Sequence, residues 1–579
     1  MMSFPPGRAW SRLRLALLAG TIAAVAALGI TAAAIAAPGG KVAQQAKDRL
    51  VVLEEEIAPT LDPDGPNGAQ PQTQEIIDNL MDPLVTYNTT LENKVQVPLY
   101  KIGQLAFKPR LAQSYTKQGL VWTFHLRKGV KSCAGNELTA DDVVYTFARG
   151  KSVSGASPIA WFLSNAGGVI ALDPVLHPKD LKVTALHGEV TKVDPYTVQI
   201  KQFVPSELFP RVTSIFALEI FDSKEMKAHA TAKDPWSHTY NLGQNAPGFG
   251  AYCLKSWTKG SEMVLTANPN YYLGQPQYKT VTIRKVPTLA NRVAAIRSGS
   301  ADLMYPVTPV VVQELQKTSN VDVLSWFNNN TVSIGLNYKV KPFGDPGNQY
   351  LRQAIAYALP YTDIMTQDFK GLAKQWYSLV QSRYYGYLPV TTYHTDLAKA
   401  KALLAKAGYP GGKGLEKYKD AFTMYYVTER SALLEPIANR IRTALQQIGI
   451  NITFAPITSS EMNTRELTKF DLPMWIRDQL QPIGTDAGYA IQLFYVTAKV
   501  GGLLPSANYS AIDSDFLKQQ KLVGAARLAI LHKMQVKMMA DLPLIPILEY
   551  PTWIPVRKGI TNMEGRANNS ITYWWFKGP

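Results

Sequence analysis

The chain has 579 residues, a formal net charge of +16 at pH 7 and only two cysteines. This length suffices for two large lobes or about three to four average domains, each with a substantial hydrophobic core. The basic residues are scattered singly or in pairs, whereas nucleic-acid binding needs clustered Lys and Arg to neutralise phosphates. The charge therefore indicates solvated surface, with docking on a membrane or a bias toward acidic ligands as alternatives.

The first 37 residues have the pattern of a secretory signal peptide. Three arginines precede an apolar run over residues 15–37, which ends in the small residues Ala34 and Ala36. An uncleaved N-terminal anchor is the alternative, because the run is long, but the A-x-A site favours cleavage. No cysteine follows the run, which argues against a lipoprotein. We expect a periplasmic protein, anchored only if the signal is retained.

The first clear elements of the exported body surround the turn KSCAGN. Apolar and polar residues alternate over 121–126, which predicts a half-buried strand with His125 on its polar face. After the turn, Thr139 stands three residues before Asp142 and just ahead of an apolar set, the pattern of a capped helix start. We therefore interpret Asp141 and Asp142 as helix-start residues rather than catalytic carboxylates.

Strand-like and helix-like segments alternate irregularly through the rest of the chain, which predicts an α/β body. The predicted strands lie near residues 197, 279 and 321, and the predicted helices near 351, 396 and 435. The helix from Asp396 should end at Ala407 and Gly408, because glycine commonly stops a helix and Pro410 cannot continue it.

No catalytic or metal-binding motif stands out. The sequence lacks HExxH, GxSxG, GxxxxGK[ST] and CxxC patterns, and the glycines near Gly248 lack the third glycine of a dinucleotide fingerprint. The seven histidines show no metal-ligand spacing. We therefore predict a binding protein without catalytic residues, metal or cofactor.

Cys133 and Cys253 are the only cysteines. In an oxidising compartment they are a disulfide candidate, and closing a loop of roughly 120 residues would stabilise the fold by about 4–5 kcal/mol in the chain-entropy model. Two separate buried thiols are the alternative, since nothing in the sequence shows that the two positions meet.

Several segments together resemble the family 5 extracellular solute-binding proteins, the dipeptide- and oligopeptide-binding subunits of bacterial ABC importers. The segment VWTFHLRKGVKSCAGNELTADDVVYTFARG from Val121 resembles the family's signature, and NAPGFGAYCLKSWTKGSEMVLTANPNYYLGQP from Asn245 resembles its Gly-Ala-Tyr and Asn-x-x-Tyr-Tyr block. Further similar segments, in the family's order, begin at residues 61, 109, 286, 350, 400 and 540. One departure is the sequence CAGN at 133–136, where most members have His-Asp-Gly or Ser-Asp-Gly, which suggests a subgroup with different ligand specificity.

The resemblance implies an α/β, two-lobed periplasmic binding protein of the class II or cluster C type, with two hinge crossings and an enlarged first lobe. By similarity, lobe I takes residues 38–329, with an inserted subdomain at roughly 76–215, lobe II takes 330–545, and 546–579 return to lobe I. It also implies a monomer that binds a small molecule or peptide and delivers it to an inner-membrane ABC permease, without nucleic acid as a partner.

Ligand-contact residues follow from the family-matching blocks. Trp161 and Phe162 lie where the family places an aromatic ligand contact. Gly250, Ala251 and Tyr252 lie where a strand edge of lobe I meets the ligand backbone. Core packing is the alternative role for each of these residues.

In peptide-binding members, a lobe II aspartate near a tryptophan pairs with the α-ammonium group of the ligand. Trp475 and Asp478 reproduce this Trp-x-x-Asp spacing, whereas Asp486 fits the aspartate that precedes the following helix equally well. Both aspartates are candidates for the anchor. Their structural alternatives are a surface charge for Asp478 and a helix N-cap for Asp486.

The sequence therefore predicts an exported substrate-binding protein that captures a di- or oligopeptide in a cleft between two lobes. A secreted hydrolase is one alternative, which assays on peptide and glycoside substrates would reveal. A binding protein of the same fold for a non-peptide ligand is another, because members of the family also take sugars, opines, metal chelates and antibiotics. A chaperone or signalling receptor that uses the same cleft without import is a third.

Overall fold

The computed structural model describes residues 48–578 except 66, 99–106, 153–160, 170–187, 204, 215–217, 345–347, 479–481, 483, 505–506 and 567–569. The predicted signal peptide, residues 1–37, lies outside the described residues. All of the described residues belong to one compact unit, Lys47–Pro579. Within this described part, every helix is too short or too polar to cross a membrane.

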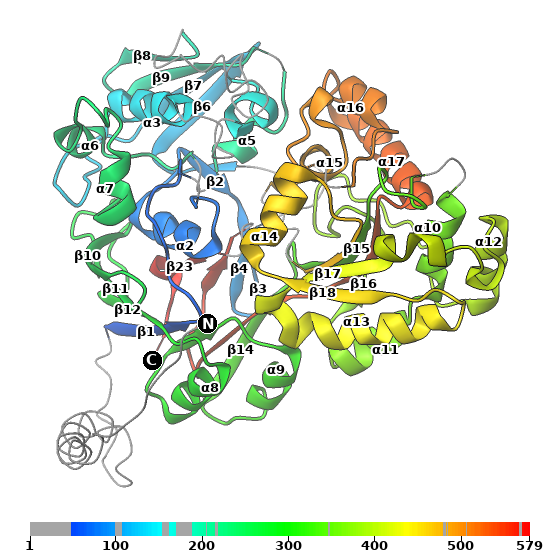
Figure 1. Ribbon diagram of the computed structural model, residues 1–579. Coiled ribbons are helices and arrows are strands. Elements are labelled where there is room, and N and C mark those ends of the chain that lie inside the picture. Colours follow the sequence, from blue (N-terminus) through cyan, green and yellow to red (C-terminus); the bar gives the residue numbers. More distant parts are fainter. Residues whose placement is uncertain are drawn as a thin grey trace, which may run out of the picture. The chain divides into compact units, whose positions relative to one another are not determined.

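A seven-stranded sheet forms one half of this unit (Figure 1). β1, β12 and β13 are parallel, and β21 pairs antiparallel with both β13 and β14. Every residue of β1 after Arg49 is buried, as expected for a central strand covered on both faces. In sheet order the strands are β10 (Tyr252–Thr258), β11 (Glu262–Ala267), β12 (Thr280–Lys285), β1 (Arg49–Glu54), β13 (Leu303–Tyr305), β21 (Thr552–Arg557) and β14 (Val321–Trp326).

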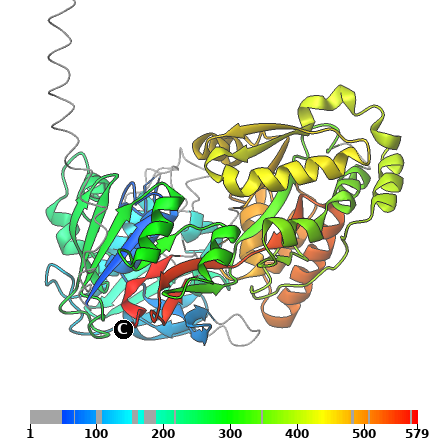
Figure 2. The same cartoon turned by 90° about the horizontal axis from the view of Figure 1, so that it is seen from below.

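A six-stranded sheet forms the core of the other half, and Figures 1 and 2 show the two sheets in separate halves of the body. β17 is parallel to β18 and β19, whereas β15 runs antiparallel to its neighbours β19 and β20. In sheet order the strands are β16 (Lys374–Gln375), β20 (Leu544–Glu549), β15 (Thr331–Leu336), β19 (Met474–Arg477), β17 (Thr423–Val427) and β18 (Thr453–Ile457).

Two short connections join the large sheets. One runs from the end of β14 to the start of β15, across residues 327–330, and the other from the end of β20 to the start of β21, across residues 550–551. The predicted lobe boundary after residue 545 thus falls within β20. Since a residue spans at most about 3.6 Å, the sheet edges joined by these connections lie close together.

Smaller sheets and helices complete the two halves. The smaller sheets are β2 (Val85–Tyr87) with β5 (Phe107–Pro109); β23 (Ile571–Thr572), β22 (Met563–Gly565), β4 (Val95–Pro98) and β3 (Thr89–Glu92); and β6 (Ala112–Gln118), β7 (Val121–Leu126), β9 (Thr197–Lys201) and β8 (Val190–Asp194). The helices are α2 (Pro71–Leu80), α3 (Ala140–Ser152), α5 (Phe209–Val212), α6 (Ser223–Ala228), α7 (His238–Gly243), α8 (Leu289–Ser298), α9 (Pro309–Leu315), α10 (Gln349–Ala358), α11 (Tyr361–Asp363), α12 (Leu397–Lys406), α13 (Ser431–Gln446), α14 (Ser459–Thr464), α15 (Ala487–Phe494), α16 (Asp513–Gln519) and α17 (Gly524–Asp541).

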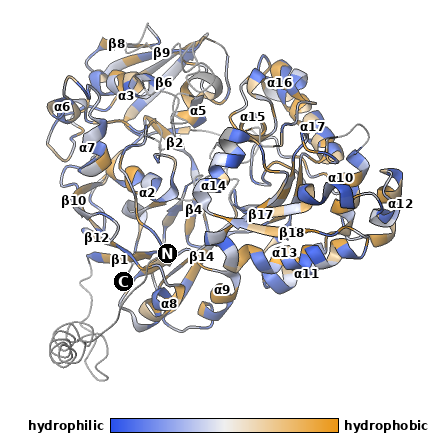
Figure 3. Ribbon diagram, viewed as in Figure 1, coloured by the Kyte–Doolittle hydropathy of each residue, from blue (hydrophilic) through white to orange (hydrophobic). Residues whose placement is uncertain are grey.

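The long helices are amphipathic, with hydrophilic and hydrophobic stretches alternating along α12 and α13 (Figure 3). In α13, the buried residues recur every three or four positions, which places them on one face of the helix. Leu433, Leu434, Ile437, Ala438 and Ile441 carry most of this face. α13 lies along the second sheet (Figure 1), so this face contributes to the core of that half.

The predicted strand and capped helix around KSCAGN are confirmed. β7 buries its alternate apolar residues and leaves His125 exposed. At the start of α3, the Thr139 N–H donates a 2.7 Å hydrogen bond to the carboxylate of Asp142. Asp142 also accepts a 2.8 Å hydrogen bond from the Ser223 N–H, so this acidic residue has a structural role.

The predicted bounds of the helix from Asp396 are also confirmed. The Asp396 side chain caps α12 by accepting a hydrogen bond from the Lys399 N–H at 2.9 Å. Ala407 is the C-cap, and Gly408 follows with a φ of +90°, a conformation that glycine adopts without steric cost.

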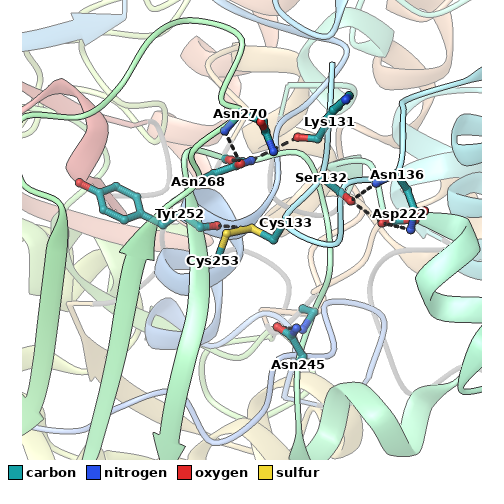
Figure 4. The surroundings of a disulfide bond; sticks show 12 residues. Lys131, Ser132, Cys133, Asn136, Asp222, Asn245, Tyr252, Cys253, Asn268 and Asn270 are labelled. Atoms are coloured by element: carbon teal, nitrogen blue, oxygen red, sulfur yellow. Dashed lines mark hydrogen bonds between the residues drawn. A yellow bond between two sulfur atoms is a disulfide. The ribbon is translucent and has the colours of Figure 1, made fainter. Parts of the chain in front are cut away.

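Cys133 and Cys253 form a disulfide that joins the KSCAGN turn to β10 (Figure 4). Their Cα atoms are 5.7 Å apart, although 120 positions separate them in sequence. Two more bonds hold the same turn, because Ser132 Oγ donates to Asp222 at 2.6 Å and Asn136 Nδ2 donates to it at 2.9 Å. The disulfide therefore belongs to a polar cluster that fixes the turn before α3.

Candidate functional site

The candidate site lies at the two sheet edges that are joined by the connections at 327–330 and 550–551. In the first sheet, β1 ends there at Glu54 and β13 ends at Tyr305. In the second sheet, β17 ends there at Val427 and β19 at Arg477. Ligands of α/β proteins commonly bind beyond the carboxyl ends of parallel strands. Here two such edges are adjacent, so the residues that follow each strand are candidates for ligand contact.

An ion pair lies at the edge of the second sheet. Asp478 directly follows β19 and is buried, while Arg430 ends the 3₁₀ turn after β17. Arg430 donates to Asp478 Oδ2 from Nε at 2.8 Å and also from Nη2, and the Tyr550 hydroxyl donates to the same oxygen at 3.3 Å. Burial lowers the pKa of Arg430, but the charge of Asp478 outweighs it and holds that pKa above its ordinary value. Glu55, which follows β1, contributes to this rise across the two sheets.

Two buried carboxyl groups lie at the edge of the first sheet. Glu54 ends β1, and Glu75 projects from α2 and accepts hydrogen bonds from the hydroxyls of Tyr305 and Tyr573. Burial raises the pKa of Glu54 well above its ordinary value, although Arg292 opposes the rise. Burial also raises the pKa of Glu75, and the charge of Glu54 raises it further. This edge therefore favours protonated carboxyl groups.

Asp486 lies at the start of α15, as its structural alternative predicted. Its side chain caps the helix by accepting a 2.7 Å hydrogen bond from the Gly488 N–H. Arg527 of α17 donates to both carboxylate oxygens, at 2.7 and 3.0 Å, and Arg211 of α5 lies 3.3 Å away. Burial alone would raise the pKa of Asp486, but the two arginines hold it below its ordinary value. Asp486 is therefore a buried, fully paired anion.

Aromatic side chains lie next to the ion pairs that Asp486 forms with Arg211 and Arg527. Trp161 is buried and donates from Nε1 to the carbonyl oxygen of Gly501 at 3.0 Å. The Phe162 ring stacks on Tyr489 of α15, with centroids 6.3 Å apart and planes 12° from parallel. We name this the α15 contact, and its members are Trp161, Phe162, Glu207 and Arg211 on one side and Asp486, Tyr489, Gly501 and Arg527 on the other.

Trp475 lies in the interior of the second sheet. It belongs to β19 and is 1% exposed, and a Cβ atom at Gly335 of β15 would overlap its indole ring. Among the described residues, no partner accepts a hydrogen bond from its Nε1. Glycine at 335 thus permits the close approach of the indole to the neighbouring strand.

Gly250, Ala251 and Tyr252 pack against other parts of the first half. The Gly250 N–H donates to the carbonyl of Leu80 at 2.9 Å, and a Cβ atom at Gly250 would overlap that backbone. The Ala251 carbonyl accepts a 2.8 Å hydrogen bond from the Asn268 N–H, and the buried Tyr252 hydroxyl donates to the carbonyl of Tyr278 at 2.9 Å. These polar groups are engaged within the protein.

The structure therefore brings Trp161, Phe162 and Asp486 into one contact, and it places Asp478 apart from them at the sheet edge. Asp478 is buried, which corrects its structural alternative as a surface charge. The ligand contacts of all the predicted residues, Trp161, Phe162, Gly250, Ala251, Tyr252, Trp475, Asp478 and Asp486, stay predictions.

The arginines that pair with the two aspartates were not predicted from the sequence. Arg430 and Arg211 belong to no motif, so nothing local distinguishes them from other basic residues. A signal existed in the position of Arg430 shortly after the strand at 423–427, and in the run Glu54–Glu56 directly after an apolar strand. Charges immediately after buried strands lie where ligands commonly bind.

The described residues contain no group of three or more His, Cys, Asp or Glu side chains that could hold a metal ion.

Comparison with known proteins identifies the family. The model of the bacterial extracellular solute-binding proteins, family 5 middle region, matches residues 106–501. The dipeptide-binding protein of Escherichia coli is 28% identical over 353 residues, which are 58% of this chain and 62% of that protein. The chain thus spans less than two thirds of that relative's length.

Two solved structures share the fold. The periplasmic binding protein DppA of Helicobacter pylori, in complex with the peptide STSA, has a TM-score of 0.71 and 21% identity over 92% of this chain and 98% of that one. AgaA of A. tumefacien R10, in complex with agropinic acid, has a TM-score of 0.69 and 20% identity over 92% of this chain and 99% of that one. This likeness confirms the predicted two-lobed α/β fold. The chain belongs to the family 5 bacterial extracellular solute-binding proteins.

Proposed function

We propose that this protein is the solute-binding subunit of a bacterial ABC importer, which captures a di- or oligopeptide and delivers it to an inner-membrane permease. The observation that carries the proposal is the family match over residues 106–501. A family of binding proteins favours binding over catalysis, so the protein acts without an enzymatic step. The signal pattern over residues 1–37 supports export to the periplasm.

The two sheet edges give this function a mechanism. In the proposal, lobe I comprises residues 38–329 and 546–579, lobe II comprises 330–545, and the connections at 327–330 and 550–551 act as the hinge. A peptide lies between the edges, where backbone groups and a few fixed charges can bind its main chain. Trp161, Phe162 and the segment Trp475 to Asp486 contribute to its specificity.

Native mass spectrometry tests this function directly. The protein, purified from its own bacterium without denaturation, should carry a peptide mass that tandem fragmentation resolves into an amino-acid sequence. A retained sugar or chelate, or peptide hydrolysis by the purified protein, would contradict the peptide-binding proposal.

An opine-like ligand is the second candidate. What supports this candidate is the fold shared with AgaA, whose structure holds agropinic acid. Calorimetry with agropinic acid and with alanine peptides of two to five residues would separate the two candidates. Tight binding of the opine alone would select this second function.

A further inference from the structure

A cluster of lysines covers the surface of the second half around α12. The segment 396–420 contains six lysines and three acidic residues. Each of these lysines is exposed, and among the described residues no carboxylate forms an ion pair with any of them. We name this cluster the α12 basic surface, and its members are Lys399, Lys401, Lys406, Lys413, Lys417 and Lys419.

Two lysines of α12 lie over tyrosine rings of α10. The Nζ atom of Lys399 is 4.1 Å from the centroid of the Tyr357 ring, and it donates to the Tyr357 hydroxyl at 2.7 Å. The Nζ atom of Lys406 is 4.1 Å from the centroid of the Tyr350 ring. The face of an aromatic ring attracts a cation but carries no net charge. These contacts therefore orient both ammonium groups and leave their positive charge uncompensated.

The other end of the segment packs against the end of α12. Tyr418 lies in the 3₁₀ helix Glu416–Phe422, and its ring meets the ring of Tyr409, which follows α12. The two ring centroids are 6.5 Å apart and the planes are at 87°. This contact brings the lysines of residues 413–419 beside the C-terminal end of α12, so both parts of the segment contribute to one surface.

Two of the three acidic residues are engaged by backbone groups. The Asp396 carboxylate caps α12 by accepting from the Lys399 N–H at 2.9 Å. The Glu416 carboxylate accepts from the Gly414 N–H at 2.7 Å. Since lysines outnumber acidic residues two to one in this segment, the α12 basic surface keeps an excess of positive charge.

The side chains between the lysines favour a lipid surface over a protein partner. Ala398, Ala402 and Ala405 form an exposed strip of α12, because residues three or four apart share a helix face. Within this fully described segment, no large apolar side chain is exposed. Protein interfaces are poor in lysine and rely on aromatic or arginine anchors. Clusters of about four to eight Lys or Arg residues instead bind anionic lipids by charge alone.

The position of α12 leaves the candidate site free. The helix lies at the outer end of the second half, on the side away from the first sheet (Figure 1). A flat surface that contacts α12 would therefore not cover the sheet edges at the two connections. The net charge of +16 adds long-range attraction to any anionic surface.

We propose that the α12 basic surface docks this protein on a membrane of anionic phospholipids. The contact is peripheral and electrostatic, because lysines and alanines meet the headgroups and no large apolar side chain enters the bilayer. The inference goes beyond the proposed function, and it holds whichever ligand the protein takes. Docking would keep the protein beside the membrane to which, as proposed above, it delivers that ligand.

Vesicle sedimentation tests the inference. The protein without residues 1–37 is used, because their apolar run would itself bind lipid, and Lys47–Pro579 forms the compact unit. It should pellet with vesicles that mix phosphatidylglycerol and phosphatidylcholine in equal amounts, and it should stay in solution with pure phosphatidylcholine. Binding should be present at about 0.01 M salt and lost at about 1 M, because the Debye length falls from about 30 to 3 Å.

A triple variant removes half of the surface charge. Lys399→Gln, Lys401→Gln and Lys406→Gln together should weaken binding to the mixed vesicles by about 100-fold, since each lysine near an anionic surface contributes about fivefold. Lys→Arg at the same three positions keeps the charge and should keep the binding. Circular dichroism melting checks that each variant is folded.

The matched control removes the same charge from the proposed lobe I. Lys233→Gln, Lys255→Gln and Lys317→Gln change three exposed lysines that lie outside the α12 basic surface. This variant should change binding by less than about threefold, because the attraction of a charge falls off within a Debye length of the membrane.

Three results would overturn the inference. Binding to pure phosphatidylcholine as strong as binding to the mixed vesicles would show that anionic headgroups are not recognised. Equal weakening by the two triple variants would show that the net charge acts without a defined surface. A folded glutamine variant of α12 that binds the mixed vesicles as tightly as the unchanged protein would remove the role of these lysines.

Discussion

At the scale of single residues, Asp486 has the strongest structural role among the predicted site residues. It is fully buried, caps α15 and neutralises two arginines. Asp486→Asn would leave the buried Arg211 without a counter-charge and would leave Arg527 with Glu207 alone. We expect the free energy of unfolding to fall by about 3–5 kcal/mol, the usual effect of breaking a buried ion pair. Urea denaturation followed by circular dichroism measures it.

Asp471→Asn is the control for this substitution. Asp471 pairs with Arg465 at 2.9 Å, but its side chain is 47% exposed. An exposed pair contributes about 0–1 kcal/mol, so the control should lose little stability. Equal losses in the two variants would show that the α15 contact does not depend on the Asp486 charge.

At the scale of elements, the disulfide between the KSCAGN turn and β10 stabilises the first half. It closes a loop with a sequence separation of 120. The chain-entropy model assigns such a loop about 4–5 kcal/mol, so reduction should lower the melting temperature. Scanning calorimetry with and without a reductant measures the change. Thiol labelling of denatured, unreduced protein should find no free cysteine, and two labelled thiols would contradict the bridge.

The sequence predicted elements better than it predicted contacts between them. The bounds of α12 follow from Asp396 and Gly408, because capping depends on neighbours along the chain. The alternation in β7 is local in the same way. Whether Cys133 contacts Cys253, or Arg211 contacts Asp486, depends on how distant segments of the chain fold together. The residues around each position do not indicate such a contact.

The same limit applies to the candidate site. The block from Trp475 to Asp486 could be found because its residue types and spacing resemble those of a known family. The partners that determine what its charges can do come from elsewhere, since Arg430 is 48 positions before Asp478 and Arg527 is 41 positions after Asp486. The sequence therefore allows the two aspartates to be located, but it does not reveal the arginines that neutralise them.

At the scale of the whole molecule, the proposed hinge predicts a change of size on ligand binding. Rotation about the connections at 327–330 and 550–551 should bring the lobes together. Small-angle scattering should therefore give a smaller radius of gyration with the ligand identified by mass spectrometry than without it. An unchanged radius would count against closure.

The α15 contact supplies a variant for the same measurement. Glu207 and Arg211 belong to the predicted lobe I and bind Arg527 and Asp486 of the predicted lobe II. The double variant Glu207→Gln with Arg211→Gln should weaken this contact and increase the radius of the unliganded protein. The matched control is Glu262→Gln, whose partner Arg284 lies in the same sheet.

The buried carboxyl groups at the end of β1 couple folding to proton uptake. Glu54 and Glu75 have pKa values well above their ordinary 4.5 in the folded protein. The folded chain therefore keeps protons that the unfolded chain releases, and its stability falls as the pH rises from about 4.5 toward those raised values. Asp62, with a pKa of about 2, acts in the opposite direction but only below about pH 4.

We therefore expect a larger unfolding free energy at pH 5.5 than at pH 8, measured by urea denaturation at both. Glu75→Gln keeps the shape of the side chain and removes the titrating proton, so it should reduce that difference, whereas Glu416→Gln at an exposed position should not. A difference that Glu75→Gln leaves unchanged would assign the effect to other groups. If the protein is exported as proposed, this proton linkage makes mild acid outside the cytoplasm a stabilising condition.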